Sequence, residues 1–201
     1  VFFGETNTAG QFWSWKDGIL STILPAGETY PGRQSIAIAD DGRVYFGEDT
    51  TSAYFWTWKD GVLSTILPAL ENRPGKNNVA IDPVGGVFFG EGVSPGSLWL
   101  WRSGILSTIV DGENKPGSSN LTVAPDGRAF FGEDGAPGSF WTWKAGVLST
   151  ILDAETNPGR SSTAIAADGR VFFGEYSTTG SFWTWKDGAL TTILDGESYP
   201  G

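Results

Sequence analysis

The sequence predicts an all-β fold, a five-bladed β-propeller, and three observations support this prediction. A motif of the form Val-Phe-Phe-Gly-Glu begins at residues 1, 44, 87, 129 and 171, so that successive copies are 43, 43, 42 and 42 residues apart. A repeat of about 40 to 45 residues is the length of one propeller blade, which is a four-stranded sheet. Each repeat is also rich in Phe, Trp, Ile, Val and Thr and is interrupted by Asp-Gly and Pro-Gly, which are typical of strands and tight turns.

Residues 162–194 show the four strands of a blade most clearly. A first strand at 162–166 leads through an Asp-Gly hairpin into a second strand at 171–175. After a loop, a third strand at 181–186 leads through another Asp-Gly hairpin into a fourth strand at 189–194. The first strand carries small residues, as the crowded innermost strand of a propeller requires, and the aromatic residues lie on the later strands.

The first strand is present in four copies, whereas the other three strands are present in five. The chain begins at a second strand and stops at Pro200-Gly201, where every earlier copy is followed by an eleven-residue segment that carries a first strand. We therefore expect the natural polypeptide to continue past Gly201 and to close the ring with a fifth innermost strand. Without that strand the first blade would present an unpaired edge, through which we expect self-association.

Composition and charge exclude several classes of function. The length suits a single domain over residues 1–201. The net charge of -10 argues against nucleic acid as a partner, and no apolar run is long enough for membrane insertion. The chain has no His and no Cys, which excludes catalytic triads and the usual zinc sites. We expect no metal and no cofactor, and the sequence leaves the compartment open.

The loops between the second and third strands and those after the fourth strand should lie together at one end of the blades, opposite the Asp-Gly hairpins. Two rings of carboxylates are expected there, one from the Glu that ends each second strand and one from a Glu-x-x-Pro-Gly frame after each fourth strand. Basic residues follow the second frame. The first ring is Glu5, Glu48, Glu91, Glu133 and Glu175; the second is Glu28, Glu71, Glu113, Glu155 and Glu197; the bases are Arg33, Lys76 and Arg160.

All ten Trp residues lie in pairs on the third strands, two positions apart, so that both members of a pair share one face of the sheet. The rings either fill the wedge between neighbouring blades or, at the first position of each pair, stack on a sugar beside the Glu and the variable loop. We expect core packing for the second ring of each pair. The candidate ligand-binding rings are Trp13, Trp56, Trp99, Trp141 and Trp183.

The two Glu rings have other interpretations as well. They could cap the turns by accepting hydrogen bonds from backbone N–H groups, or they could bind calcium through converging carboxylate oxygens.

Residues 158–175, Pro-Gly-Arg-Ser-Ser-Thr-Ala-Ile-Ala-Ala-Asp-Gly-Arg-Val-Phe-Phe-Gly-Glu, resemble the blade core of NHL and SMP-30/gluconolactonase-type propellers. In those blades a small-residue strand that ends in Asp-Gly precedes an aromatic strand. The fivefold repeat resembles tachylectin-type lectins, whose near-identical blades each bind a sugar, and the combination of Trp, Glu and Arg is similar to that of bladed fucose lectins. The carboxylate and asparagine metal set of the SMP-30 propellers has no single match in this chain, so no catalytic residue is transferred from the resemblance.

The polar groups recur almost blade for blade, and this favours a multivalent carbohydrate-binding protein over an enzyme. We expect up to five equivalent sites and glycans or glycoconjugates as partners. A structural or protein-interaction scaffold is the alternative from another class. A carboxylate-dependent hydrolase or lactonase is the third; it would need one blade with unique acids, for which the candidates are Asp40, Asp49 and Asp82.

Overall fold

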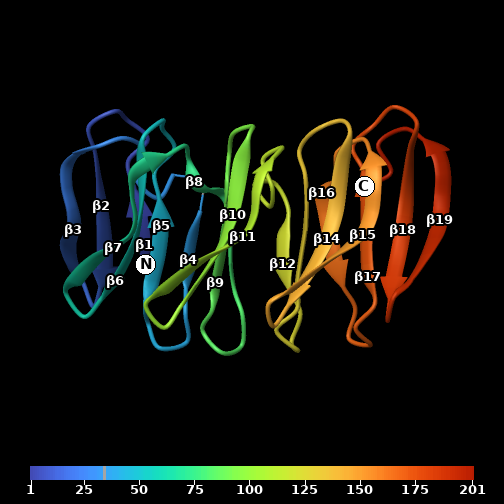
Figure 1. Cartoon of the computed structure of the whole chain (residues 1–201). Helices are drawn as coiled ribbons and strands as arrows, with labels where there is room; N and C mark the ends of the chain where they lie inside the picture. The colour runs from blue at the N-terminus through green and yellow to red at the C-terminus, as the bar shows by residue number, and fades with distance from the viewer. Residues whose placement is uncertain (34) are drawn as a thin grey trace.

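The computed structural model describes residues 1–33 and 35–201. These residues form nineteen β-strands and no α-helix, and the strands are arranged in five antiparallel sheets (Figure 1). The strands of each sheet follow one another in chain order. The predicted all-β propeller fold is confirmed, and we number its sheets as blades 1 to 5 along the chain. The described residues contain no helix long and apolar enough to cross a membrane.

Blade 1 has three strands, and the other blades have four. Blade 1 comprises β1 (Phe2–Gly4), β2 (Gly10–Lys16) and β3 (Ile19–Glu28); blade 2, β4 (Ile36–Ile38), β5 (Val44–Gly47), β6 (Ala53–Lys59) and β7 (Val62–Glu71); blade 3, β8 (Pro74–Ile81), β9 (Val87–Glu91), β10 (Gly96–Arg102) and β11 (Ile105–Glu113); blade 4, β12 (Leu121–Val123), β13 (Ala129–Gly132), β14 (Gly138–Lys144) and β15 (Val147–Glu155); and blade 5, β16 (Pro158–Ile165), β17 (Val171–Glu175), β18 (Gly180–Lys186) and β19 (Ala189–Glu197).

A two-residue turn joins the last two strands of every blade. In blade 5 both turn residues have positive φ, 51° at Asp187 and 88° at Gly188. This geometry matches the right-handed twist of paired strands and explains the recurring Asp-Gly. The turn fixes the register of β18 against β19, in which Trp183 lies opposite Thr192. On the other side of β18, Trp183 lies opposite Phe173 of β17.

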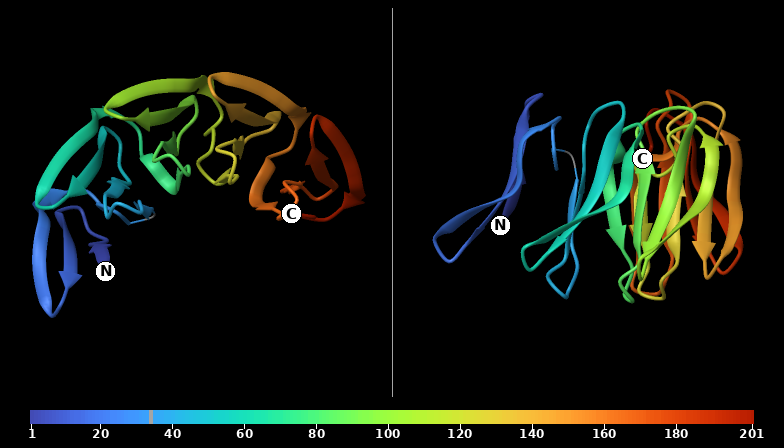
Figure 2. Two further views of the ribbon diagram at one scale, coloured as in Figure 1. Left: turned by 90° about the horizontal axis from the view of Figure 1, so that it is seen from below. Right: turned by 60° about the vertical axis from the view of Figure 1, so that its left-hand side comes forward.

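The blades stand side by side in an arc (Figure 2). The short first strands lie on the inner side, the long last strands lie on the outer side, and the two chain ends lie at opposite ends of the arc. Five sheets are therefore present, but they do not meet as a ring in this structure. The closed five-bladed ring, its closing strand and the single-domain assignment stay predictions.

Apolar side chains fill the boundaries between neighbouring blades. At three of the four boundaries, a Phe of one blade stacks on a Phe of the next. The stacked pairs are Phe12 and Phe46 at 3.9 Å between centroids, Phe55 and Phe89 at 4.0 Å, and Phe140 and Phe173 at 3.9 Å. Full burial of each such side chain contributes about 1.5–3 kcal/mol, so these boundaries hold the arc together.

Steric constraints explain why the repeated motif has Gly at its fourth position. A Cβ atom on Gly47 would lie 2.0 Å from the carbonyl oxygen of Pro74, the first residue of β8 in the next blade. In the preceding loop, the Gly32 N–H donates to the Gly47 carbonyl oxygen at 2.9 Å. The Pro-Gly loops therefore cross the second strands so closely that only Gly fits beneath them.

Candidate functional site

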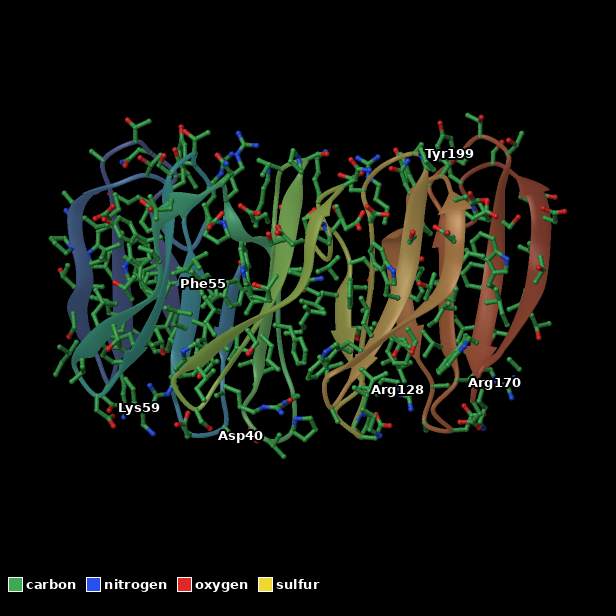
Figure 3. The ribbon with its side chains drawn as sticks, viewed as in Figure 1. Asp40, Phe55, Lys59, Arg128, Arg170 and Tyr199 are labelled. Atoms are coloured by element: carbon green, nitrogen blue, oxygen red, sulfur yellow. The ribbon has the colours of Figure 1, made fainter. Side chains whose placement is uncertain are left out.

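Two loops of each blade build one face of the arc, which we call the loop face; it lies at the top of Figures 1 and 3. In every blade a backbone hydrogen bond joins the loop after the last strand to the loop that follows the Val-Phe-Phe-Gly-Glu motif, with N···O distances from 2.7 to 3.1 Å. The donor residues all have positive φ, between 45° and 54°. The donors are Tyr30, Arg73, Lys115, Asn157 and Tyr199, and the acceptors are Asn7, Thr50, Val93, Gly135 and Ser177.

The same backbone frame carries different side chains in each blade. One variable position is the hydrogen-bond donor, and the other directly follows the Glu that ends the second strand. The pairs are Thr6 and Tyr30, Asp49 and Arg73, Gly92 and Lys115, Asp134 and Asn157, and Tyr176 and Tyr199. The repeats thus diverge on the loop face while their strands stay alike, which differs from the expected near-identity of the five sites.

The second-strand Glu residues join neighbouring blades. Glu48 accepts one hydrogen bond from the Thr29 N–H at 2.9 Å, in the loop from blade 1, and another from the Tyr54 N–H at 2.8 Å, in its own blade. The same pair of bonds recurs at Glu91, Glu133 and Glu175, all of which are buried. These four carboxylates take the turn-capping role that the sequence left open.

A second Glu lies beside each of these buried carboxylates. Burial, together with the neighbouring Glu28, raises the pKa of Glu48 to about 7. Burial is the main cause of the raised pKa of Glu91 and of Glu133 as well. The pKa of Glu155 is raised by burial and by the adjacent Glu175. The two predicted Glu rings therefore meet as pairs at the blade boundaries. Within the described residues, no group of three or more acidic side chains is placed to hold a metal ion.

The predicted bases gather around two aspartates. Asp49 is mostly buried and lies 3.3 Å from Arg33 Nη1, 3.6 Å from Arg73 Nε and 3.7 Å from Lys76 Nζ. Asp134 lies 2.9 Å from Arg160 Nε and 3.3 Å from Lys115 Nζ. Sequence reasoning placed Arg33, Lys76 and Arg160 on this face but missed Arg73 and Lys115.

Two tyrosines of blade 5 form an exposed aromatic surface on the loop face. The rings of Tyr176 and Tyr199 have centroids 4.9 Å apart, and the residues are 42% and 51% exposed. The Arg160 guanidinium lies over the Tyr176 ring, 4.6 Å from its centroid, and its Nε lies 2.9 Å from Asp134. We call Tyr176, Tyr199, Arg160 and Asp134 the tyrosine platform; Tyr199 is labelled in Figure 3. The sequence signal for it is the appearance of Tyr at both variable positions of one blade.

The candidate Trp rings lie mainly inside the blade boundaries. Trp56, Trp99, Trp141 and Trp183 are only 4–7% exposed, and each ring packs beside a Phe of the second strand of its own blade. Trp13 at the open end of the arc is partly buried. A sugar would have to displace core side chains to stack on any of these four buried rings.

Blade 3 breaks the repeat at the opposite face, in the hairpin between β8 and β9. Asp82 stands where the other blades have Ala, and its side chain is fully buried. One carboxylate oxygen accepts hydrogen bonds from the Val84 N–H at 3.0 Å and the Gly86 N–H at 2.7 Å, and the other pairs with the Arg102 guanidinium. A Cβ atom on Gly86 would lie 2.7 Å from Arg102 Nη2, so this Gly makes room for the ion pair.

A cavity of about 690 Å³ opens beside this hairpin, between blades 2, 3 and 4, and is lined in part by Asp40, Arg43, Tyr45 and Trp101. Asp40 is exposed on its rim at the lower face in Figure 3, whereas Asp49 lies on the loop face. Asp40 and Asp82 both line this cavity, where Asp82 is paired with Arg102, whereas Asp49 lies on the opposite face.

These features define a bladed β-propeller fold with a variable loop face, and solved structures of that kind are similar to this chain. A virginiamycin B lyase from Staphylococcus aureus matches with a TM-score of 0.61 and 15% identity, over 94% of this chain and 68% of the lyase. A gluconolactonase from Xanthomonas campestris matches with a TM-score of 0.55 and 15% identity, over 95% of this chain and 69% of that protein. A eukaryotic initiation factor matches with a TM-score of 0.66 and 11% identity, over 98% of this chain and 51% of that protein.

No protein-family model matches the sequence, and no curated protein matches it. The likeness in structure, at 11–15% identity, concerns the fold. The chain spans 51% of the initiation factor and somewhat over two thirds of each of the two enzymes. The predicted resemblance to β-propellers is confirmed at the level of the fold. The similar structures do not single out tachylectin-type lectins.

The comparisons correct one expectation. The recurrence of polar groups from blade to blade leads us to expect a binding protein that is not an enzyme. A lyase and a gluconolactonase share this fold, which contradicts that expectation. Catalysis needs only a few groups on one face, and the loops of this chain do differ from blade to blade. Symmetry of the strands therefore gives no reason to exclude an enzyme.

Proposed function

We propose that the loop face binds a carbohydrate at the tyrosine platform. The observation that carries this proposal is the exposed pair of Tyr176 and Tyr199, with ring centroids 4.9 Å apart, beside the Arg160–Asp134 ion pair. Exposed aromatic faces pack against the C–H faces of a sugar ring, and charged donors and acceptors share its hydroxyl groups. The proposal keeps the predicted class of ligand but moves the aromatic contact from the Trp rings to the Tyr rings.

The platform is held in place by the backbone. The Tyr199 N–H donates to the Ser177 carbonyl oxygen at 2.7 Å, and Ser198 Oγ donates to the Thr178 carbonyl oxygen at 3.0 Å. These bonds join the two loops that carry the rings. A preorganised aromatic pair loses little conformational entropy when a ligand binds, which favours measurable affinity at a small site.

The experiment is a glycan-array screen followed by isothermal titration calorimetry on the strongest hit. We expect one sugar per chain and at least about tenfold weaker binding, equivalent to about 1.4 kcal/mol, for Tyr176→Ala and for Tyr199→Ala. The matched control is Tyr30→Ala, since Tyr30 occupies the same frame position in blade 1 without a partner ring, and it should bind as the parent does. Binding of four or five sugars per chain, or equal binding by all three variants, would overturn the proposal in favour of the Trp sites or of another surface.

A second candidate is carboxylate-dependent hydrolysis of a sugar lactone, and the Glu28–Glu48 pair favours it. The pKa of Glu48 is raised to about 7, so one member of the pair can hold a proton while the other is ionised near neutral pH. The partly buried Glu28 would take a proton from water as its oxygen adds to the lactone carbonyl carbon. The bond from that carbon to the ring oxygen would break, and the proton held by Glu48 would pass to the ring oxygen, which gives the open hydroxy acid. This rests in part on the similarity to a gluconolactonase, a likeness of fold.

A pH-stat assay with glucono-δ-lactone tests this candidate against the spontaneous reaction. We expect acceleration that is lost in Glu28→Gln and kept in Glu113→Gln, the corresponding change at another blade boundary. A rate equal to the uncatalysed one would remove this candidate and leave carbohydrate binding unaffected.

A further inference from the structure

We propose that the cavity between blades 2, 3 and 4 binds a small apolar amino acid, at a site separate from the loop face. The cavity has a volume of about 690 Å³, and small-molecule sites usually have about 300–1,000 Å³. It opens among the hairpins that join the first and second strands of these blades. Blades 2, 3 and 4 each have a neighbouring blade on both sides (Figure 2), so the walls of the cavity belong to packed inner blades.

The lining of the cavity is in large part apolar. Tyr45 and Trp101 line it together, with ring centroids 5.8 Å apart and ring planes at 60°. Ile38 and Val84 line it as well and are 55% and 76% exposed, so both present apolar surface to a ligand. Aromatic and aliphatic walls of this kind bind the apolar side chain of a small molecule.

Blade 3 supplies an apolar wall where the other four-stranded blades are charged. Val84 stands at a position where those blades have an Asp that pairs with a Lys of its own blade: Asp41, Asp126 and Asp168. The blade 3 hairpin instead has a buried carboxylate, Asp82, which pairs with Arg102. The charged groups that remain available to a ligand therefore come from blade 2.

Asp40 and Arg43 supply one carboxylate and one guanidinium from the same hairpin of blade 2. Asp40 is exposed on the rim, stands where blades 3, 4 and 5 have Pro or Ala, and forms no ion pair with any residue that the structure describes. Arg43 Nε lies 3.8 Å from Asp41 Oδ2, which is too far for a hydrogen bond. Asp41 is itself paired with Lys59 at 2.8 Å. Both Asp40 and Arg43 can therefore bind a ligand of opposite charge.

The equivalent arginines of blades 4 and 5 have other contacts. Arg128 lies over the Trp185 ring of the next blade, 5.4 Å from its centroid. Arg170 Nη2 donates to Asp168 Oδ2 at 3.3 Å. Arg43 has neither kind of contact among the described residues, so its N–H groups are available to a ligand carboxylate, which an arginine binds through two parallel hydrogen bonds.

The hairpin holds the two charged groups in place. Ala39 N–H donates to the Arg43 carbonyl oxygen at 2.8 Å, and Gly42 N–H donates to the Ala39 carbonyl oxygen at 2.9 Å. A ligand suits this site if it has an ammonium group for Asp40, a carboxylate for Arg43 and an apolar side chain for the cavity. An apolar α-amino acid such as phenylalanine has this combination of groups.

The test is isothermal titration calorimetry of the 201-residue chain with L-phenylalanine. We expect one molecule per chain, and about tenfold weaker binding in Asp40→Asn and in Arg43→Gln, since each loses a charge-assisted hydrogen bond. Two analogues assign the groups. Phenethylamine, which lacks the carboxylate, should bind Arg43→Gln as it binds the parent. Hydrocinnamate, which lacks the amine, should bind Asp40→Asn as it binds the parent.

Val84→Asp gives blade 3 the Asp of the other blades and should weaken phenylalanine binding, because it places a charge in the apolar wall. The matched control is Arg170→Gln, the same change at the same hairpin position of blade 5, which should bind as the parent does. Tyr176→Ala should also bind phenylalanine normally, so the result is independent of carbohydrate binding. Absence of phenylalanine binding, an equal loss in Arg170→Gln, or analogues that do not distinguish Asp40→Asn from Arg43→Gln would each overturn the proposal.

Discussion

Glu91 accepts a hydrogen bond from the backbone N–H of Asn72 at 2.9 Å, and this bond crosses the boundary between blades 2 and 3. The second carboxylate oxygen accepts from Ser97 N–H at 2.8 Å within blade 3. One buried carboxylate thus ties together a loop of the preceding blade and a loop of its own. Its recurrence at three other boundaries explains why Glu follows Gly in each motif.

Replacement of Glu91 by Ala should destabilise the protein by about 2–4 kcal/mol, because two N–H groups lose a charged acceptor. Denaturant unfolding measures the change. The matched variant is Glu5→Ala at the open end of the arc, where the carboxylate has one backbone N–H partner instead of two. Glu5→Ala should lower the free energy of unfolding by clearly less than Glu91→Ala does. Equal losses would show that the bond between blades contributes nothing measurable.

Stability should fall as pH rises from about 5 to 7. The pKa of Glu48 is about 7 in the folded chain against an ordinary value of 4.5, so the folded state keeps a proton that the unfolded state has released. The free energy of unfolding then decreases with pH across this interval. The pKa values of Glu91, Glu133 and Glu155 are raised and act in the same direction. The lowered pKa values of Asp41, Asp126 and Asp168 act at lower pH, where stability should fall as the solution becomes more acidic.

Differential scanning calorimetry at pH 5, 6 and 7 checks this prediction. The melting temperature should be highest at pH 5, and Glu48→Gln should flatten its decline. A melting temperature that rises over this interval would show that the Glu pairs are ionised in the folded state at pH 5.

The ion pair of blade 3 predicts a pattern of non-additive substitutions. Asp82→Ala alone should lower the free energy of unfolding by about 1–3 kcal/mol, because the Val84 and Gly86 N–H groups lose their buried acceptor and the partly exposed Arg102 loses its partner. Blades 2, 4 and 5 have an Asp–Lys ion pair on the surface at the equivalent hairpin; in blade 2, Asp41 pairs with Lys59 at 2.8 Å. The combined variant Asp82→Ala, Val84→Asp, Gly86→Arg and Arg102→Lys gives blade 3 the residues that blade 2 has at these positions.

We expect the combined variant to recover most of the stability lost in Asp82→Ala. Thermal unfolding of both variants and of the parent gives the comparison. A combined variant as unstable as the single one would mean that blade 3 needs its ion pair for a reason beyond the local hairpin.

The sequence predicts the strands and turns well because their signals are local and repeated. Asp187-Gly188 fixes a two-residue hairpin by backbone conformation alone, and the spacing of the motifs gives the blade length. The Gly47 position follows from a close approach of a Pro carbonyl oxygen that recurs in blades 1 to 4. The shape of the arc depends on how whole blades pack, which no local pattern specifies.

The candidate site was harder to predict because it depends on differences between repeats. Glu48 and Trp141 were selected for their recurrence, and recurrence here accompanies burial and backbone capping. Tyr176 and Tyr199 each occupy a position that varies, and their pairing emerges only when two loops from distant parts of blade 5 are joined. Asp82 was singled out as unusual, but its partner Arg102 replaces a Lys, a change that looks conservative in sequence.

One comparison measures how much the second ring of a Trp pair, which the sequence assigns to the core, contributes to stability. Trp143 and Trp15 occupy the same position in blades 4 and 1, yet Trp143 is 9% exposed and Trp15 is 49% exposed. Trp143→Ala should therefore cost about 3–5 kcal/mol, as for a large side chain removed from a core. Trp15→Ala should cost less than half as much when measured in dilute solution, where any second copy has dissociated. Neither change should weaken carbohydrate binding by the folded fraction, because both rings lie away from the tyrosine platform. Loss of binding in Trp143→Ala at temperatures where the variant is fully folded would contradict the assignment of this ring to the core alone.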